Sequence, residues 1–455
     1  MENAHVLESA LAGDLLTSEA GMTHLVTLAD QFGGRAAGSS DEAAAGAYIA
    51  EALLSLAGSP PLVRQFRYTG WQRGEAQLTV IGPVEQPVPS VALPGSPSAS
   101  LEAELISIGS GEAEEVDAIG AEIEGKIVLC AAEAPRPNGQ PPSHRRVKYL
   151  RAARLGAVGF LYVGQNPGML AVTGGLAGTE AAPIAGFGLA LEVGARLERL
   201  LGRGTVTLRL QMQHRHEGVT SSNLIADIPG RSEEVLLIGA HYDGHDIAQA
   251  ATDNGSGAAV LLELVRALAP WRGRLQRSVR CCFWGSEEAG LLGSWHYSRT
   301  AGPALDPVVW VLNLDSLVNG PPGRLRLRVW PPATQVAVAP VLPSRSLPVE
   351  VGGGLTSDSD HFPFAAAGIP TIAAGAAGPR SGLVGRGWGH TIADTVDKVD
   401  PAALAYAAAT AGRIVVRLSE LTEAPPRLNG QALEQALESA GRLEASHRWE
   451  TLQFT

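Results

Sequence analysis

The stretch VLLIGAHYD, residues 235–243, gives the strongest indication of fold class in the sequence. Its first six residues form an unbroken apolar run, which is typical of a strand buried on both faces of a parallel sheet. Similar runs return at residues 278–284 and 308–314, with helical patterns at 255–268 and 287–300. Because strands that alternate with helices indicate βαβ crossovers, we expect an α/β fold with a mixed, largely parallel sheet flanked by helices.

Length and composition are those of an ordinary globular protein. The chain has 455 residues, 45% hydrophobic and 18% charged, which excludes collagen-like and wholly disordered classes. It has 35 basic and 46 acidic residues, a net charge of −11 and no basic stripe, so we expect no nucleic-acid partner. With only three cysteines, two of them adjacent, a disulfide framework is not expected, and a reducing compartment fits.

Hydropathy predicts no membrane partner. No segment approaches the roughly 18 consecutive apolar residues that a spanning helix needs. Residues 1–22 contain glutamates but no lysine or arginine, and they lack a long apolar run, which differs from a secretory signal. We therefore expect a cytoplasmic protein, and we leave open whether it forms a homo-oligomer.

Pattern changes along the chain predict four segments. Residues 1–84 would begin the main domain, with a helical pattern at 19–56 that breaks at a Gly-Gly pair and restarts with an acidic first turn. Residues 85–213 have the short strands and strong helix of a separate insertion. Residues 214–424 would complete the main domain, and 425–455 would be a helical tail, set off by two prolines.

Polar side chains follow each predicted strand, at the sheet edge where open α/β folds place their functional sites. Carboxylates and imidazoles are the ligands that hard to borderline cations take. One such residue alone is more often a helix cap or a solvated group, but their gathering at successive strand ends favours a metal site. The candidates are His241, Asp243, Asp253, Glu287, Glu288, Asp315 and, in a later glycine-rich loop, His390.

These motifs resemble the co-catalytic zinc metallopeptidases of family twenty-eight, in clan MH, which include aminopeptidases and glutamate carboxypeptidases. The resemblance covers about 223–418 and the opening helices, and it implies a zinc exopeptidase fold. The segments 124–128 and 154–159 are similar to the small, β-rich protease-associated domain often inserted in this family, here at 85–213. The motifs that carry the resemblance are His241-Tyr242-Asp243, Asp253-Asn254-Gly255-Ser256-Gly257, EEAGLLGS at 287–294, Asp315 and His390.

The resemblance implies two zinc ions per chain and assigns their ligands. Asp253 would bridge the two ions. His241 and Asp315 would complete one zinc site. Glu288 and His390 would complete the other. Two such ions lower the pKa of a shared water and stabilise the oxyanion that forms during hydrolysis.

The resemblance also implies a reaction, removal of N-terminal residues from peptide substrates. Asp243 would hold the ring of His241, as ligating imidazoles commonly require. Glu287 would be the general base for attack by a metal-bridging hydroxide. A single-zinc enzyme resembling glutaminyl cyclases is disfavoured, because both metal half-sites are present.

Two alternatives stay open. An acidic pocket suits the cationic N-terminus of a peptide, whereas recognition of a C-terminal carboxylate requires arginines. Arg380 and Arg386 precede His390, so a carboxypeptidase of the same family remains an alternative, although both arginines read more simply as solvated. A non-catalytic, partner-binding protein on the same scaffold is the other.

Some positions depart from the family's pattern. The usual aspartate before the bridging one is Thr252 here, and the tyrosine that some relatives use as oxyanion donor is replaced by Thr356. Zinc, or another donor such as Tyr242, would then stabilise the oxyanion. As in relatives, we expect a cis peptide bond between Asp253 and Asn254.

Two further expectations concern side chains near these motifs. His245 and Asp246, in the short loop after the first strand, are predicted to face solvent rather than bind metal. Cys281 and Cys282 lie in a predicted buried strand, where they would pack as small apolar residues.

Overall fold

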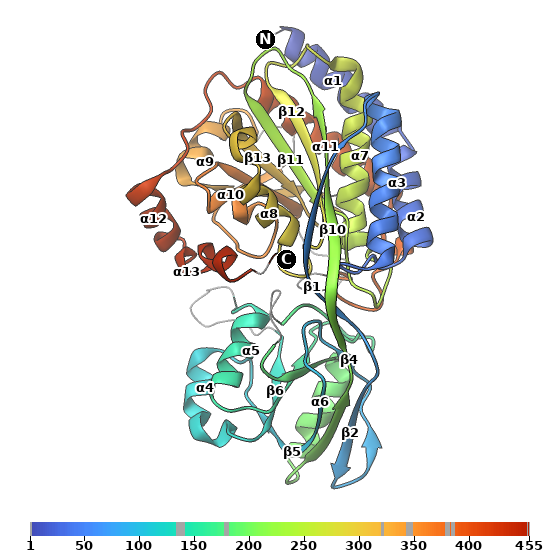
Figure 1. The fold of residues 1–455 in the computed structure, drawn as a ribbon, viewed down its shortest axis with the longest axis vertical. Coiled ribbons are helices and arrows are strands. Elements are labelled where there is room, and N and C mark those ends of the chain that lie inside the picture. The colour runs from blue at the N-terminus through green and yellow to red at the C-terminus, as the bar shows by residue number, and fades with distance from the viewer. Residues whose placement is uncertain are drawn as a thin grey trace. The chain divides into compact units, whose positions relative to one another are not determined.

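The computed structural model describes residues 2–132, 142–176, 182–319, 323–342, 349–377, 383, 387–452 and 454. The chain divides into two compact units, each described here by itself (Figure 1). The first unit contains Met1–Arg67, Val219–Gly382 and Asp394–Phe454. The second contains Tyr68–Gly218 and Leu383–Ala393.

A mixed sheet forms the centre of the first unit. Within the described residues its strand order is β1-β10-β12-β11-β13-β16-β14-β15. The central strands β12, β11, β13 and β16 run parallel, while β10 and β14 pair antiparallel with β12 and β16. The predicted fold class is therefore confirmed. The strands are β1 (Leu62–Gln72), β10 (Arg215–Ile228), β11 (Val235–His241), β12 (Ser278–Trp284), β13 (Val308–Leu314), β14 (Leu325–Trp330), β15 (Val349–Gly353) and β16 (Thr371–Ala376).

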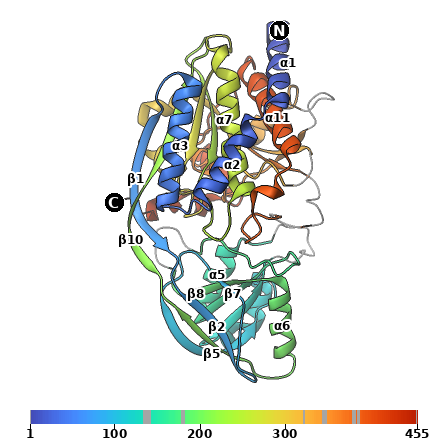
Figure 2. The ribbon, with the colours of Figure 1, turned by 90° about the vertical axis from the view of Figure 1, so that its right-hand side faces the viewer.

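A layer of helices covers one face of this sheet, as Figure 2 shows for α2, α3 and α7. Nearly every residue of α7 is buried, because the helix lies between the sheet and its neighbouring helices. α3 begins where predicted, with the Ser39 hydroxyl accepting a hydrogen bond from the Glu42 amide, and ends at Gly58 in the left-handed region. The helices of the layer are α1 (Glu2–Thr17), α2 (Ala20–Phe32), α3 (Ser40–Ala57), α7 (Ser256–Leu268) and α11 (Pro401–Ser419).

The predicted helix at 287–300 is wrong at its start, since α8 spans Leu292–Thr300. Ser286 and Leu291 have φ angles of 55° and 63°, a conformation that a right-handed helix of L-residues does not continue. Glu287 and Glu288 therefore lie in a loop, here called the double-glutamate loop (residues 285–291), whose backbone amides are available to other groups.

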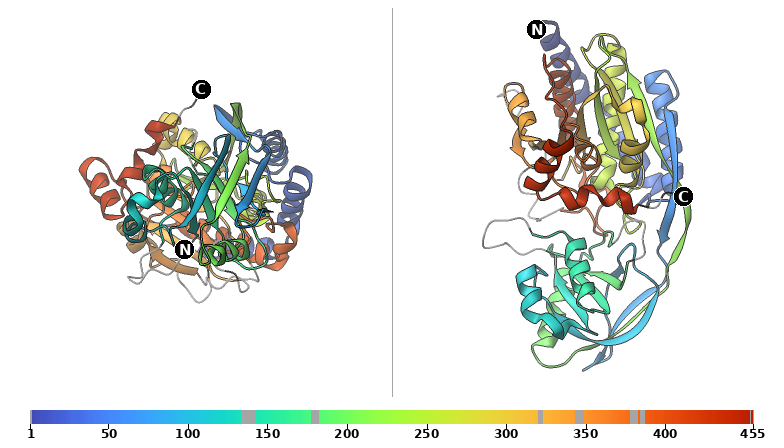
Figure 3. Two further views of the ribbon diagram at one scale, coloured as in Figure 1. Left: turned by 90° about the horizontal axis from the view of Figure 1, so that it is seen from below. Right: turned by 60° about the vertical axis from the view of Figure 1, so that its left-hand side comes forward.

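Short helices complete the first unit at its C-terminal end. α12 (Gly430–Ser439), α13 (Leu443–Ser446) and the 3-10 turn η6 (Arg448–Thr451) follow α11, and we call residues 427–452 the C-terminal arm. Figure 3, where this segment is red, shows it as separate short helices on the surface of the unit. Leu437 of the arm is buried in a cluster with Leu291, Trp295 and Phe362. α9 (Pro332–Val338) and α10 (Phe362–Ala365) lie in the same unit.

The second unit has its own sheet, with strand order β3-β2-β9-β5-β6-β7-β8-β4 among the described residues, and two buried apolar clusters. β5, β6, β7 and β8 are parallel. Its elements are β2 (Ala76–Gly82), β3 (Gln86–Pro87), β4 (Val91–Ala92), β5 (Ala99–Ser107), α4 (Ala113–Ile119), β6 (Ile127–Ala131), α5 (Arg145–Arg154), β7 (Gly159–Val163), β8 (Ala185–Leu189), α6 (Leu191–Leu201) and β9 (Thr207–Met212).

Cys130, Cys281 and Cys282 are free and buried. The adjacent pair lies on β12, as expected for two small apolar residues. Among the helices of the described residues, none combines the length and the apolar character needed to cross a membrane.

Candidate metal centre

Three strand ends bring the predicted site residues of the first unit together. Because β11 runs parallel to β12 and β13, with His241 opposite Trp284 and Gly239 opposite Asn313, their carboxyl ends meet at one edge. His241 Nε2 lies 3.5 Å from Asp253 Oδ1 and 3.8 Å from Asp315 Oδ1. The imidazole thus faces two carboxylates across a gap that is too long for a hydrogen bond.

Glu287 joins this group. His241, Glu287 and Asp315 each offer a ligand atom, and these atoms lie within 4.8 Å of one another. All three side chains are buried or half-buried. Residues from three separate strand ends therefore converge on one small volume, as the sequence predicted for them.

Asp243 connects the first strand end to the double-glutamate loop. Its carboxylate accepts hydrogen bonds from the Glu287 amide at 2.9 Å and the Glu288 amide at 3.0 Å. One of the same oxygens lies 3.5 Å from Nδ1 of His241. Asp243 thus contacts the ring it was predicted to hold, and it also fixes the backbone that carries both glutamates.

Asp253 lies in an irregular turn, η2 (Ala251–Gly255), just before α7. Its peptide bond to Asn254 is cis, as predicted. The Asn254 side chain donates to the Leu314 carbonyl at 2.9 Å and accepts from the Gly257 and Ser316 amides. This amide therefore ties the turn at Asp253 to the end of β13, next to Asp315.

Sequence reasoning missed Asp394, which supports the same turn. Its carboxylate accepts from the Thr252 amide and hydroxyl, both at 2.7 Å, and from the Asp253 amide at 3.1 Å. Burial and the charge of Asp253 together raise the pKa of Asp394 to about 6, although these hydrogen bonds act to lower it. Asp394 lies four positions after His390. The only feature in the sequence that could have indicated its role is its carboxylate.

The prediction that His245 faces solvent is wrong, while Asp246 is exposed as expected. His245 is buried, and its Nε2 lies 3.0 Å from Glu288 Oε2. The loop turns inward because Gly34 leaves room for it; a Cβ at Gly34 would lie 2.2 Å from the His245 carbonyl oxygen. This contact gives Glu288 an imidazole neighbour within the first unit.

His390 belongs to the short segment Leu383–Ala393, which is part of the second unit. There its Nδ1 lies 3.2 Å from the Thr173 carbonyl oxygen, and its own carbonyl accepts from the Thr173 amide at 2.8 Å. Its role as a zinc ligand stays a prediction. Arg380 and Arg386, which kept a carboxypeptidase open, lie outside the described residues.

A second group of polar residues lies against Asp315. Ser359 donates to Asp315 Oδ2 at 2.6 Å and accepts from the Asn313 amide group at 2.8 Å. Asp360 is fully buried and accepts from the Ser294 hydroxyl at 2.5 Å. Burial raises the pKa of Asp360 to about 7, while the charge of His241 opposes this shift.

The oxyanion donor suggested from the sequence does not suit that role. The Tyr242 hydroxyl donates to the Ser222 carbonyl at 2.9 Å, and its ring packs against Gly46 of α3. Thr356, in the position of the family's tyrosine, lies 3.4 Å from His361 Nε2. The side chain of Tyr242 therefore points into the helical layer.

The charges of the site fit a divalent cation. Burial raises the pKa of Glu287 well above its ordinary value, and the charges of Glu288, Asp360 and Asp315 raise it further, although His241 opposes them. Burial disfavours a charged His241, yet nearby carboxylates hold its pKa well above the ordinary value. The negative field that holds a proton on this imidazole would also favour a metal ion bound to the imidazole in place of the proton.

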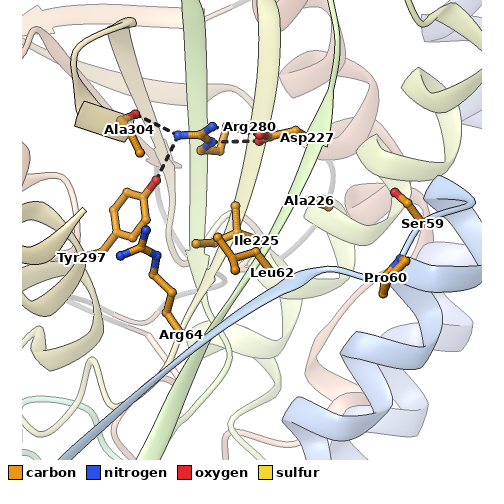
Figure 4. A pocket seen from close by; sticks show the side chains of 10 residues that line it. All are labelled: Ser59, Pro60, Leu62, Arg64, Ile225, Ala226, Asp227, Arg280, Tyr297 and Ala304. Atoms are coloured by element: carbon orange, nitrogen blue, oxygen red, sulfur yellow. Dashed lines mark hydrogen bonds and ion pairs between the residues drawn. The ribbon is translucent and has the colours of Figure 1, made fainter. Parts of the chain in front are cut away.

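A separate cavity of about 220 Å³ lies between β1, β10 and β12 of the first unit, and no predicted site residue lines it (Figure 4). Arg280 crosses it, with two 2.8 Å hydrogen bonds to Asp227 and further ones to Tyr297 Oη and the Ala304 carbonyl. Asp227 neutralises Arg280, and a second arginine of the lining, Arg64, lies with its guanidinium over the Tyr297 ring.

The first unit is thus an α/β sheet with carboxylates and imidazoles buried at its carboxyl edge, side chains that suit a divalent cation. Residues 223–415 match Peptidase family M28. The chain is 32% identical over 254 residues to the protein named "Probable leucine aminopeptidase 2" of Aspergillus fumigatus, a match that covers 55% of this chain and 48% of that protein. The chain spans about half the length of the curated relatives it matches.

Solved structures extend the likeness to nearly the whole chain. A peptidase M28 precursor of Shewanella amazonensis has a TM-score of 0.80 and 25% identity, covering 94% of this chain and 99% of that chain. The zinc aminopeptidase BSAP of Bacillus subtilis shares the fold, with a TM-score of 0.65 and 23% identity over 89% of this chain and 96% of that one. Residues 223–415 are thus similar to Peptidase family M28, and the likeness in fold to a peptidase M28 precursor extends over 94% of the chain.

Proposed function

We propose that this protein is a di-zinc metallo-exopeptidase that removes N-terminal residues from peptides. The observation that carries the proposal is the approach of His241 Nε2 to within 3.5 and 3.8 Å of the Asp253 and Asp315 carboxylates at one sheet edge. The match to Peptidase family M28 and the aminopeptidase names of its relatives point the same way.

The ligands of the first zinc ion are proposed to be His241, Asp253 and Asp315, with Asp253 shared between two ions. Glu288 and His390 would complete the second site. Chain connectivity supports His390, which is four residues from Asp394.

Glu287 is the proposed general base. It lies in the group of His241 and Asp315 yet follows a different strand, and the hydrogen bond from its amide to Asp243 orients the loop that carries it. The zinc ions would lower the pKa of a shared water and polarise the substrate carbonyl. The Glu287 carboxylate would take a proton from that water and deliver it to the leaving amine.

The net charge of the site favours a free N-terminus. Asp243, Asp253, Glu287, Glu288 and Asp315 contribute five negative charges, and two zinc ions would return four positive charges. The remaining negative charge attracts the α-ammonium group of a peptide. A blocked N-terminus lacks that attraction.

The second unit is proposed to include an inserted protease-associated domain at 85–213. Its two matching segments lie together, since the Gly125 amide donates to the Gly156 carbonyl at 2.9 Å and the Val158 amide to the Lys126 carbonyl at 2.8 Å. Gly125 and Gly156 have φ angles of 72° and 83°, so this contact uses conformations that glycine adopts without strain. Production of residues 85–213 as a separate protein would test whether this domain folds independently.

A substrate panel tests the proposed activity. Leucyl peptides with free and with acetylated N-termini would be incubated with the zinc-loaded protein, and released amino acids would be measured with and without a chelator. We expect release from the free peptides alone, abolished by the chelator. Equal release from both would exclude an aminopeptidase, and no release from any peptide would favour the non-catalytic alternative.

A further inference from the structure

The start of the double-glutamate loop is held by a buried carboxyl group from a distant part of the chain. Glu42 lies in the first turn of α3 and is 1% exposed. Its Oε1 atom accepts a hydrogen bond from the Ser286 amide at 2.7 Å and another from the Ser286 hydroxyl at 3.0 Å. One side chain of the opening helices thus binds both donors of the residue that precedes the proposed base.

Glu42 is itself fixed by two further contacts. The Ser221 hydroxyl donates to Oε1 at 2.9 Å, and the Gly38 amide donates to Oε2 at 2.7 Å. All of these residues belong to the first unit. Because a buried polar network with all its bonds formed is rigid, the position of the Glu42 carboxyl group determines where Ser286 can lie.

Ser286 needs this support because its backbone conformation is uncommon. Its φ angle is 55°, in the left-handed region that residues with a side chain rarely adopt. The preceding residue, Gly285, leaves room for the contact, since a Cβ there would lie 2.3 Å from the Ser221 hydroxyl oxygen and 3.1 Å from Glu42 Oε1. The two hydrogen bonds from Ser286 to Glu42 therefore stabilise a turn that the loop would not favour by itself.

Glu42 and Asp243 together bind three successive amides of this loop. Glu42 accepts from the Ser286 amide, and the two oxygens of Asp243 accept from the Glu287 amide at 2.9 Å and the Glu288 amide at 3.0 Å. Asp243 also contacts a proposed zinc ligand. Among the described residues, by contrast, no proposed zinc ligand is hydrogen-bonded to Glu42. Substitution of Glu42 therefore changes the support of the loop and leaves the metal ligands in place.

We propose that Glu42 is a positioning residue for the general base, because by holding Ser286 it keeps the Glu287 carboxylate where it can take a proton from the attacking water. This inference rests on the proposed peptidase function. Proton transfer requires the two heavy atoms to approach to about 2.6–3.2 Å. A displacement of about 1 Å is enough to lower a rate about a hundredfold. Loss of the Glu42 contacts would therefore slow the reaction although every reacting group is still present.

A double-mutant cycle with Glu287 tests this role. The full-length, zinc-loaded chain and its Glu42→Ala, Glu287→Gln and doubly substituted variants would be compared on leucyl peptides with a free N-terminus. We expect Glu42→Ala to lower kcat about 10- to 100-fold, with KM and zinc content close to those of the wild type. In the presence of Glu287→Gln, the same change should lower kcat hardly any further, because the group that Glu42 positions is no longer a base.

Two more variants separate positioning from folding. Glu42→Gln keeps an oxygen that can accept from Ser286, so it should recover most of the kcat lost in Glu42→Ala. Ser39→Ala is the matched control, because the Ser39 hydroxyl accepts from the Glu42 amide at 3.1 Å and caps α3. It should lower the melting temperature and leave kcat unchanged. If Glu42→Ala does not fold, Ser286→Ala, which removes one of the two bonds, takes its place in the cycle with a smaller expected loss.

Three results would overturn the inference. An equal fall in kcat with and without Glu287→Gln would show that Glu42 does not act through the base. Loss of zinc in parallel with kcat would assign Glu42 to metal binding, and an unchanged kcat in folded Glu42→Ala would make it structural alone. If the wild type cleaves no peptide, the proposed function fails instead, and hydrogen exchange of the amides at 285–291 decides the inference. Faster exchange in Glu42→Ala than in Ser39→Ala supports it, and equal exchange overturns it.

Discussion

The carboxylate of Asp394 accepts hydrogen bonds from both the amide and the hydroxyl of Thr252, each at 2.7 Å. Thr252 precedes the proposed bridging ligand, and the other Asp394 oxygen accepts from the Asp253 amide at 3.1 Å. A residue close in sequence to His390 thereby fixes the backbone that orients the Asp253 carboxylate.

Replacing Asp394 should weaken zinc binding without removing a ligand. In Asp394→Asn, one carboxylate oxygen that accepts hydrogen bonds is replaced by an amide N–H, which cannot accept them. We therefore expect zinc affinity to fall about 10- to 100-fold, as for other residues that orient ligands. Competition with a fluorescent chelator measures this. Asp30→Asn is the control, because exposed Asp30 also accepts a side-chain bond, from Gln249, outside the site. Equal zinc affinities in the Asp394→Asn and Asp30→Asn variants would contradict the role of Asp394 in orienting Asp253.

Glu287 and Glu288 are adjacent, but their substitution should impair different properties of the protein. Glu287→Gln is expected to lower kcat by about 10²- to 10⁴-fold, because it removes the proposed base, while both zinc ions stay bound. Glu288→Gln should instead lower the zinc content. Parallel kinetics and metal analysis of the two variants separate the roles, and the reverse pattern would show that they are exchanged.

His245 should affect the second zinc site alone. Its Nε2 lies 3.0 Å from Glu288 Oε2, so it either orients that carboxylate or shares the ion with it. In both cases His245→Ala should weaken the second zinc about 10-fold or more and spare the first, as a two-step zinc titration would show. His24→Ala, which removes an imidazole bonded to Tyr48, should leave both steps intact. If the zinc titration of His245→Ala is the same as that of the wild type, His245 has no part in metal binding, as the sequence analysis expected.

Glu42 predicts an unusual dependence of stability on pH. Burial and the charge of Asp243 together raise the pKa of Glu42 to about 8, although hydrogen bonds from Gly38, Ser221 and Ser286 act to lower it. Because the folded state binds this proton more tightly, the stability from it is complete below about pH 4.5 and is lost as pH rises through 8.

Urea unfolding of the chelator-treated protein measures this effect. The free energy of unfolding should fall by up to a few kcal/mol between pH 5 and pH 8, and Glu42→Gln should reduce the slope. The slope is the quantity to compare, since glutamine also changes the hydrogen bonds at Gly38 and Ser286. Identical slopes in the two proteins would show that Glu42 does not titrate in this range.

The sequence was most informative about the buried strands, which apolar runs indicate, and about the polar residues that directly follow them. The apolar run at 235–240 predicted β11, and the parallel neighbours it implied bring His241 and Asp315 to one edge. These features follow from local patterns and from the geometry of parallel sheets, which sequence reasoning can use directly.

What the sequence could not show depends on contacts between distant segments. His245 is buried because Gly34, more than two hundred residues earlier, leaves space for its loop. α8 begins late because Leu291 has a left-handed φ of 63°, and the loop before it is held by Asp243, a residue of a different strand end, through the Glu287 and Glu288 amides. Asp394 carries no motif of its own, so only the folded chain reveals what it contacts.

The most direct test of a cation pair at this sheet edge is the zinc content of the purified chain. Atomic emission analysis after exhaustive dialysis against metal-free buffer, following saturation with zinc, should give two zinc ions per chain, and Asp253→Ala should lower that number. A wild-type chain that retains no zinc, or only one ion, would contradict the proposed di-zinc centre.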